Sequence, residues 1–401
     1  MITHAVPTRE DGLRRLEEFL PLAGRDYAEL RNHVPGVVSG LAPYIRNRLL
    51  TEEEITRAVL QRHSYEAAEK FLQEVCWRTY WKGWLEMRPS VWFRYLEDLH
   101  SLRIKMEEEP GFKERVRRAE QSETGLECLD DWARELRATG YLHNHVRMWF
   151  ASIWVHTLCL PWQLGADFFM RHLLDGDPAS NTLSWRWVCG LQTKGKVYVA
   201  TAENIERYTN GRYSPHGLLV RDAQPVTEDF LIPQPLQLNR SDRHEPGERT
   251  LLFSTDEDLS PESWGIPRCD VAGVVLADAP ESYSGMGSLP SAWKRKALEG
   301  TIARLADEFQ CPVLRLQIGE VSIPARLHTL QREHGALSLS VMTPPVGPAL
   351  CLIDSALAQL ERAGVTVRKL RRSWDNAFWP HATHGFFKLK ERIPYVLKQL
   401  F

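Results

Sequence analysis

The chain has 401 residues, 25% of them charged, and a formal net charge of -2 at pH 7. This length suffices for two domains with large cores, and the charge balance excludes a protein that is basic overall, so nucleic acid could be bound only through a local patch. No apolar run is long enough to span a bilayer, and the first residues lack the apolar core of a signal peptide. We therefore expect a cytoplasmic protein without membrane contact.

The first part of the chain is predicted to be helical. Apolar residues recur there at spacings of three and four in six segments: 9–20, 52–62, 65–87, 126–138, 143–159 and 164–174. Thr51 followed by Glu54 is a capping box that opens the second of these segments. The sequence thus predicts an all-α domain over residues 1–213.

In the second part of the chain the apolar residues follow a different pattern. Residues 214–248 are rich in Pro, Asp and Arg without periodicity and are interpreted as a linker. Short apolar runs typical of buried strands follow at 250–254, 270–278, 311–319, 337–343 and 364–370, with helical patterns at 293–309, 324–334 and 350–363. Alternating strands and helices predict an α/β domain over 249–401 with a parallel sheet, although neither common phosphate-binding loop motif is present.

Cysteine and tryptophan usage narrows the choice of function. The seven cysteines are scattered and include no CxxC pair, which argues against a zinc site, a cysteine-ligated cluster or a disulfide framework. The sequence therefore predicts no metal site. Ten of the 14 tryptophans lie before residue 190. This asymmetry directs the search for function to the helical part.

Two of the predicted helices carry faces that mix charged or amide groups with large apolar ones. On one face of each helix the spacing gathers Glu74, Trp77, Arg78 and Trp81, and Asn144, Arg147, Met148 and Ala151. Each residue alone fits an ordinary core helix with a surface ion pair. Together, these faces suit a bound planar, polar cofactor, because polar groups buried without partners cost about 1–3 kcal/mol each.

Four segments together resemble a known family. They are SGLAPYIRNRLLTEEE at 39–54, FLQEVCWRTYWK at 71–82, TGLECLDDWARELRATGYLHNHVRM at 124–148 and LPWQLGADFFMRHLLDGDPASNTLSWRW at 160–187. In order and spacing they resemble the FAD-binding domain of the photolyase/cryptochrome superfamily, over roughly residues 9–215.

The resemblance implies FAD as the cofactor and assigns residues to its site. The positions that match cofactor-binding residues of the family are Ser39, Arg78, Asn144, Arg147, Asp175, Asp177, Asn181 and Trp185. By this resemblance Asp175 pairs with Arg147, and Asn181 places its amide at the flavin N5. Ser39 lies in the segment that holds the diphosphate.

The resemblance also implies a substrate and a reaction. Repair enzymes for cyclobutane pyrimidine dimers surround the flipped lesion with side chains that match Glu74, Trp77, Asn144, Met148 and Trp187. Enzymes for the other main photoproduct have a histidine where Asn144 stands. We therefore expect light-dependent repair of pyrimidine dimers in DNA by electron transfer from photoexcited reduced FAD. The expected catalytic group is Glu74, Trp77, Asn144, Met148, Asn181 and Trp187.

The chain departs from the family in the order of its domains. The family's α/β domain normally precedes the flavin domain, whereas here the strand-rich part follows it. Residues 373–397 resemble the end of the family's N-terminal antenna domain. We therefore expect a circular permutation in which 248–401 is the relocated antenna-type domain, with a possible site for an antenna chromophore of unassigned identity. The alternative is an unrelated α/β domain fused to the flavin domain.

Two further departures affect electron transfer and DNA binding. Trp185 and Trp162 match the first two members of the family's tryptophan chain, but Ala119 occupies the outermost position. The neighbouring helices offer Trp132, Trp149 and Trp154 as replacements, and we prefer Trp154.

Two DNA-contacting arginines of the repair enzymes align with His145 and Ala200. Lys194 and Lys196 are candidate phosphate contacts in their place, or else lie in an ordinary solvated loop. Single strands, which avoid the cost of unpairing, are the expected better substrate.

Two other functions remain open from the sequence. A cryptochrome-like blue-light receptor would bind FAD and signal through a protein partner, and the missing arginines and altered tryptophan chain favour it. A helical FAD protein without light function would keep the acids and Asn181 but need not keep Trp77 and Trp187. The complete set of pocket residues favours repair.

Overall fold

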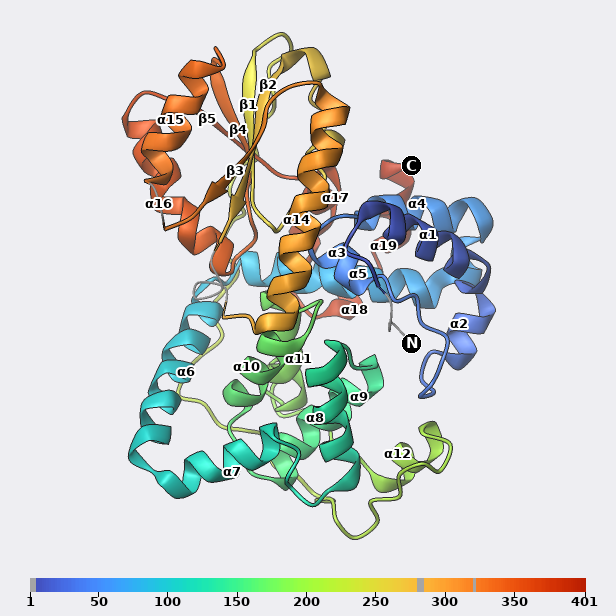
Figure 1. Ribbon diagram of the computed structural model, residues 1–401. Coiled ribbons are helices and arrows are strands. Elements are labelled where there is room, and N and C mark those ends of the chain that lie inside the picture. The colour runs from blue at the N-terminus through green and yellow to red at the C-terminus, as the bar shows by residue number, and fades with distance from the viewer. Residues whose placement is uncertain (1–4, 280–284, 320–321) are drawn as a thin grey trace.

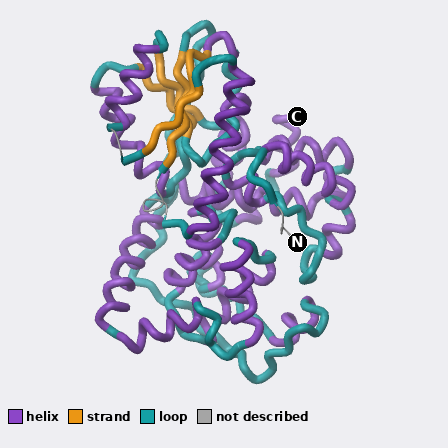
Figure 2. The backbone as a smooth tube through the Cα atoms, in the orientation of Figure 1, coloured by secondary structure: helices purple, strands orange, loops and turns teal. Residues whose placement is uncertain are grey.

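The computed structural model describes residues 5–279, 285–319 and 322–401. A parallel sheet flanked by helices lies at one end of the molecule, and the helical part of the chain forms the rest (Figures 1 and 2). Within the described residues, no helix combines the length and apolar content that crossing a bilayer requires. The predicted fold class, an all-α part followed by an α/β part, is confirmed.

The helical part extends from α1 to α12. Its α-helices are α1 (Arg9–Phe19), α2 (Arg25–Leu30), α3 (Ala42–Arg46), α4 (Glu52–Arg62), α5 (Tyr65–Glu86), α6 (Ser90–Glu108), α7 (Pro110–Glu120), α8 (Glu127–Thr139), α9 (Asn144–Ser152), α10 (Trp162–His172), α11 (Pro178–Val188) and α12 (Ala202–Tyr208). Thr51 and Glu54 form both hydrogen bonds of the predicted capping box at the start of α4.

One predicted helix is interrupted. The expected helix over 143–159 ends as α9 at Ser152 and continues as a π-helical turn, Ile153–Thr157. The backbone N–H of Leu158 donates to the carbonyl of Ile153, five residues back, which widens the turn. Such turns are rare, and no apolar period distinguishes them from an α-helix.

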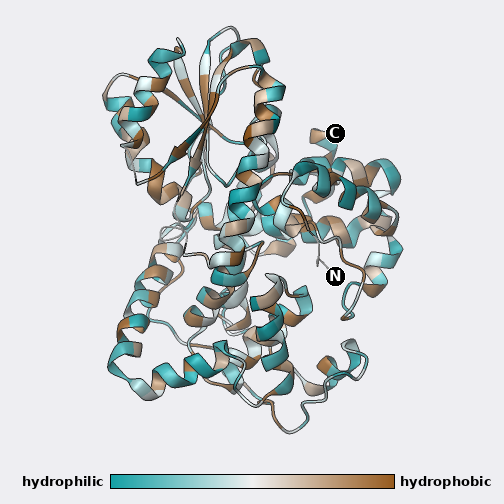
Figure 3. Cartoon of the chain, in the orientation of Figure 1, coloured by the Kyte–Doolittle hydropathy of each residue, from teal (hydrophilic) through white to brown (hydrophobic). Residues whose placement is uncertain are grey.

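Among its described residues, the α/β part contains five parallel strands. They are β1 (Thr250–Ser254), β2 (Val271–Asp278), β3 (Val313–Gln317), β4 (Ser338–Met342) and β5 (Thr366–Leu370), in the order β3-β2-β1-β4-β5. Helix α14 (Ser288–Phe309) covers one face, and α15 (Ile323–Glu333) and α16 (Pro348–Arg362) cover the other (Figure 1). Because both faces are covered, hydrophobic residues gather on the central strands (Figure 3).

The last helices leave the sheet and pack on the helical part. They are α17 (Ser373–Phe378), α18 (Phe386–Lys390) and α19 (Ile393–Leu400), and α17 and α18 contact α5. The indole N–H of Trp374 donates to Thr79 Oγ1 at 2.9 Å. A Cβ at Gly83 would lie only 2.8 Å from the ring of Trp379, so glycine is what permits this close approach.

Residues 214–248 contain neither helix nor strand and run along the helical part. Leu236 N–H donates to the carbonyl of Met87 at 2.8 Å, and the guanidinium of Arg88 donates to Pro233 at 3.1 Å. The segment thus packs on the helical part first, and its last residues contact the α/β part, where Asp242 N–H donates to the carbonyl of Lys369 at 2.8 Å.

Candidate functional site

The start of α11 explains the paired acids in the sequence LLDGDPASN. Asp177 is the N-cap of α11, where its carboxylate accepts a hydrogen bond from the N–H of Ser180 at 2.8 Å. Pro178 follows at the first helical position, where its missing N–H costs nothing. Asp175 lies two residues earlier in the short connection from α10. Both carboxylates are buried.

Three cations surround these two buried carboxylates. Arg147 on α9 donates two hydrogen bonds to Asp175, both of 2.9 Å. Arg78 on α5 lies 3.8 Å from Asp175 and 4.0 Å from Asp177. One turn further along α5, the ammonium of Lys82 lies 3.2 Å from Asp177. The structure therefore contains the predicted Arg147–Asp175 pair within a larger cluster of charge.

The cluster fixes the ionisation of both acids. Burial alone would raise the pKa of Asp177, but Lys82, Arg78 and Arg46 together lower it well below its usual range. Burial also opposes ionisation of Asp175, whose pKa is lowered by Arg147 and Arg78. Both groups therefore stay charged at neutral pH.

A second set of contacts connects the cluster to the α/β part. Glu257, which follows β1, accepts two hydrogen bonds of 2.7 Å from Arg46. The same arginine donates to the carbonyl of Gly176 at 2.6 Å, and Lys82 lies 3.8 Å from Glu257. Sequence reasoning missed Arg46, Lys82 and Glu257. The two cations lie in the segments that carry the family resemblance, but nothing local could pair them with an acid about 200 positions away.

Two polar atoms show that the cluster suits a bound ligand. Among the described residues, no atom accepts a hydrogen bond from the buried Nη1 of Arg78. Asn181 on α11 donates its amide Nδ2 to the carbonyl of Ala166 at 2.8 Å, which leaves Oδ1 as the available acceptor. An unsatisfied guanidinium donor fits a carbonyl or phosphate acceptor, and an amide oxygen fits an N–H donor. These residues therefore fit the flavin that the resemblance implies.

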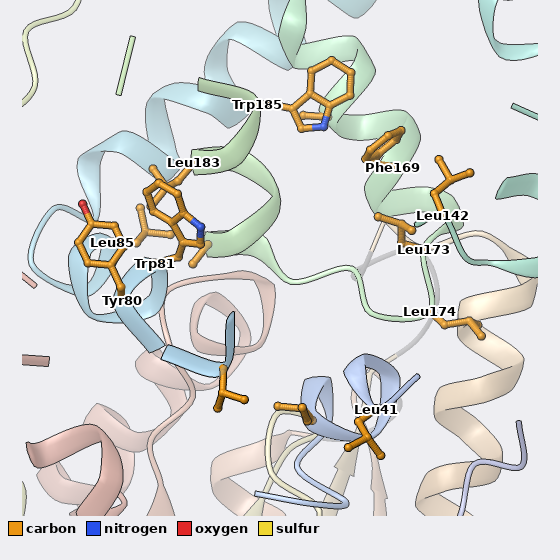
Figure 4. Close-up of a cluster of buried hydrophobic side chains, with 14 of the residues drawn as sticks. Leu41, Tyr80, Trp81, Leu85, Leu142, Phe169, Leu173, Leu174, Leu183 and Trp185 are labelled. Atoms are coloured by element: carbon orange, nitrogen blue, oxygen red, sulfur yellow. The ribbon is translucent and has the colours of Figure 1, made fainter. Parts of the chain in front are cut away.

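Trp185 lies buried between α10 and α11. Its ring meets Phe169 edge-on at 5.1 Å between centroids and Trp154 edge-on at 6.4 Å. Figure 4 shows Trp185 and Phe169 on these neighbouring helices. A Cβ at Gly165 would lie 2.3 Å from the Trp185 ring, so this glycine makes room for the indole.

Trp162 begins α10 and makes polar as well as aromatic contacts. Its indole N–H donates to Glu228 at 2.8 Å, and the guanidinium of Arg186 lies 5.6 Å from its ring centroid. Its ring stacks on Tyr95 of α6, with centroids 5.6 Å apart. Ala119, where the family has its outermost tryptophan, is buried on α7.

The side chains predicted to surround the lesion come from α5, α9 and α11, and α11 packs against both other helices. Trp77, Met148 and Trp187 are partly exposed, and Asn144 is exposed at the start of α9. The ring of Trp187 stacks on Tyr198 at 5.4 Å, which fixes its orientation. Partial exposure of these groups is consistent with a site open to a large substrate.

Glu74 is held by Arg31 at 2.5 Å. Although 31% of its side chain is exposed, desolvation raises the pKa of the Glu74 carboxyl above its ordinary value, and Arg31 acts in the opposite direction.

The remaining predicted residues lie outside the charge cluster. Ser39 precedes α3, and its hydroxyl oxygen accepts a hydrogen bond from Leu41 N–H at 3.3 Å. Lys194 and Lys196 are exposed in the loop after α11. His145 stacks on Trp149 at 4.8 Å, and Ala200 is buried, so neither offers the reach of the arginine that the repair enzymes have there.

Comparisons with known proteins agree on the helical part. Residues 71–226 match the family described as the FAD binding domain of DNA photolyase. A deoxyribodipyrimidine photo-lyase of Salmonella typhimurium is 27% identical over 238 residues, covering 56% of this chain and 48% of the relative. One from Thermus thermophilus is 29% identical over 231 residues, covering 57% and 53%. The chain thus spans about half the length of these curated relatives.

Among solved structures, a bacterial class III photolyase from Agrobacterium tumefaciens is similar with 24% identity and a TM-score of 0.42, covering 51% of this chain and 43% of that one. A cryptochrome from Synechocystis is similar with 22% identity and a TM-score of 0.41, covering 50% and 43%.

Proposed function

We propose that this chain, which belongs to the photolyase/cryptochrome superfamily through its FAD-binding domain, splits cyclobutane pyrimidine dimers in DNA when illuminated. FAD is the cofactor that this domain implies. When bound and reduced, FAD supplies the light-driven electron that opens the dimer and accepts it back afterwards. The remaining task of the protein is to hold the flavin and the flipped lesion in place.

The charge cluster supports flavin binding. In the proposed site Arg78 uses its unsatisfied Nη1 for the flavin, while Arg147 and Lys82 keep the neighbouring carboxylates charged and in position. Asn181 presents Oδ1 because its Nδ2 is held by Ala166. An acceptor at this position suits the protonated N5 of reduced flavin, which is the form that the reaction needs.

The meeting of α5, α9 and α11, which brings the predicted lesion-pocket side chains onto packed helices, is the observation that carries repair rather than flavin binding alone. In the proposed pocket Glu74 forms a hydrogen bond with the thymine edge, where negative charge develops once the electron arrives. Trp77 and Trp187 form stacking walls for the dimer, and Asn144 and Met148 complete the pocket. Single strands are the proposed better substrate, because His145 and Ala200 replace the family's arginines.

A cryptochrome-like blue-light receptor that signals through a protein partner is the second candidate. Two observations favour it: Ala119 leaves the family's tryptophan route without its outer member, and the positions of the two DNA-contacting arginines hold His145 and Ala200.

The packing of α17 and α18 on α5 supports the proposed circular permutation, with 1–213 as the flavin domain, 214–248 as a linker and 249–401 as the antenna-type domain. The strand order reverses between β1 and β4, where α/β sheets bind ligands at their carboxyl edge. A pocket at this edge is lined by Arg46, Met170, Asp256, Lys294, Pro348 and Leu352. We propose that this part of the chain binds an antenna chromophore of unassigned identity, and that the protein lies in the cytoplasm.

One experiment separates the two candidate functions. Reduced, FAD-loaded protein is illuminated with oligonucleotides that contain one thymine dimer, as a single strand and in a duplex, and restored thymines are counted against a dark control. We expect light-dependent repair that is faster on the single strand. If thymines are restored on neither substrate while the flavin still undergoes photoreduction, repair is rejected in favour of the receptor.

A further inference from the structure

Helix α18 places two neighbouring phenylalanines in opposite environments. Phe386 is 4% exposed and stacks face to face on Trp77, with centroids 3.6 Å apart and planes 13° apart. Phe387, the next residue, is 74% exposed, and its ring lies edge-on to Phe386 at 6.3 Å. An exposed phenylalanine therefore lies directly beside the ring that holds one wall of the proposed lesion pocket.

The sequence around Phe387 is basic. Residues 386–398 contain four cations, Lys388, Lys390, Arg392 and Lys398, and one acid, Glu391. Lys388 is 70% exposed and lies 3.5 Å from Glu391, which is itself 64% exposed. Exposed ion pairs of this kind contribute little to stability, so a phosphate can replace the carboxylate at little cost.

A second basic segment, the loop at 191–196, lies next to the residues that precede α18. The hydroxyl of Tyr80 donates to the carbonyl of His384 at 2.8 Å and also interacts with the side chain of Gln192. Tyr80 thus brings the residues just before α18 next to the loop that carries the exposed Lys194 and Lys196. Lysines from two distant parts of the sequence therefore lie on segments that meet at Tyr80.

We propose that α18 and the loop at 191–196 form a binding surface for single-stranded DNA, on which Phe387 stacks with a base of the strand that flanks the flipped dimer. Lys388 and Lys194 contact the phosphates of that strand, while Phe386 fixes the ring of Trp77. An aromatic platform between cations is how proteins hold single strands without reading their sequence. That the bound strand flanks a flipped dimer rests on the proposed function. The surface itself binds undamaged single strands as well.

The test uses the FAD-loaded full chain and measures binding by fluorescence anisotropy. The probes are a labelled single-stranded oligonucleotide, with and without one thymine dimer, and a duplex of the same sequence. Phe387→Ala should weaken binding of both single strands roughly ten-fold or more, the loss of one base-stacking platform. Lys388→Gln should reduce the slope of log affinity against log salt by about 0.7, the value for one phosphate contact on a single strand.

Matched variants control for general effects of the substitutions. Phe93→Ala removes a phenylalanine on α6 that is 48% exposed, and Lys105→Gln removes an exposed lysine on the same helix that also pairs with a glutamate. Both should bind as the wild type does. A dimer-containing dinucleotide has no flanking strand, so Phe387→Ala should repair it at the wild-type rate.

The outcomes separate this surface from the proposed function. If the wild type binds single strands and Phe387→Ala binds them much more weakly, the proposed surface is supported even when illumination repairs no dimer. Unchanged binding in Phe387→Ala, an equal loss in Phe93→Ala, or no single-strand binding by the wild type would each reject the surface, whatever the result for repair. An equal rate loss on the dinucleotide would place Phe387 inside the lesion pocket and reject a role in the flanking strand.

Discussion

Lys82 holds the Asp177 carboxylate at 3.2 Å, and each of these side chains is only 2% exposed. The same ammonium lies 3.8 Å from Glu257 at the end of β1. Arg46 joins Glu257 to Gly176 by a parallel route. The segment that presents the acids of the proposed flavin site is therefore held in part by a glutamate of the α/β part.

Replacing Lys82 should weaken the flavin site. Lys82→Met leaves Asp177 and Glu257 with less buried positive charge, and removing one partner of a buried ion pair costs about 3–5 kcal/mol. We expect a lower ratio of flavin to protein after gel filtration and a lower melting temperature. Lys105→Met, an exposed lysine on α6, is the control and should change neither. Full flavin retention in Lys82→Met would show that the cluster does not position the site.

The Arg147–Asp175 pair should matter for flavin retention in the same way. Asp175→Ala leaves Arg147 without its two hydrogen bonds, and Arg147→Ala leaves a buried carboxylate without its main partner. Each variant should lose much of the yellow flavin, and the double variant should lose less than the sum of the two, because the partners are coupled. Full occupancy in both single variants would contradict the placement of the site.

Glu74 should affect the photochemistry more than substrate binding. Its proposed role is to stabilise charge that exists only after electron transfer, so Glu74→Ala should lower the quantum yield of repair with a smaller change in affinity. Trp187→Ala should instead weaken lesion binding by about 1–3 kcal/mol, as a lost stacking platform. Quantum yield and affinity measured on one dimer-containing strand distinguish the two. If neither substitution changes the quantum yield or the affinity, the lesion binds elsewhere.

Glu86 makes the stability of the protein depend on pH. This residue, the last of α5, accepts a hydrogen bond from Val346 N–H at 3.1 Å, and burial raises its pKa from 4.5 to about 7. The folded state therefore binds this proton more tightly than the unfolded chain, so the free energy of unfolding should fall as pH rises from about 4.5 to 7. Glu86→Gln should remove that part of the slope in urea titrations at several pH values, and an unchanged slope would contradict it.

Photoreduction of oxidised flavin should pass through Trp162. Trp162→Phe should nearly abolish it, as measured by transient absorption. Trp154 contacts Trp185 edge-on, as an alternative second step would require, whereas Trp162 stacks on Tyr95. An effect of Trp154→Phe would identify a second route, and an undiminished long-lived tryptophan radical in Trp162→Phe would reject the first.

The central strands could be predicted from the sequence because each is a short run of mostly apolar residues that are buried. The predicted strand at 250–254 coincides with β1, all five residues of which are buried. Helix α6 lies outside the predicted set although Val91, Trp92, Tyr95 and Leu99 are buried at helical spacing, since charged residues between them dilute the pattern. Local sequence therefore identifies elements best where burial is continuous.

The candidate site was accessible from the sequence only in part. Asp175, Asp177 and Arg147 lie in segments whose residue order resembles a family, so their pairing could be expected. The role of Glu257 could not be predicted, because it contacts Arg46 across 211 positions and no sequence motif near either residue indicates the other. The same holds for Phe386 on Trp77, a contact that only the return of the chain to α5 creates.

The packing of α17 and α18 on α5 also sets an order of events during synthesis. Tyr80 and His384, joined by a hydrogen bond, are 304 positions apart. At about 5–20 residues per second, α5 waits roughly 15–60 s on the ribosome before the residues that cover it are made. During that time Trp77 and Tyr80 face solvent, and contacts of such long sequence separation form slowly. We therefore expect the nascent chain to need protection from aggregation and to acquire its flavin late, after its last helices have docked.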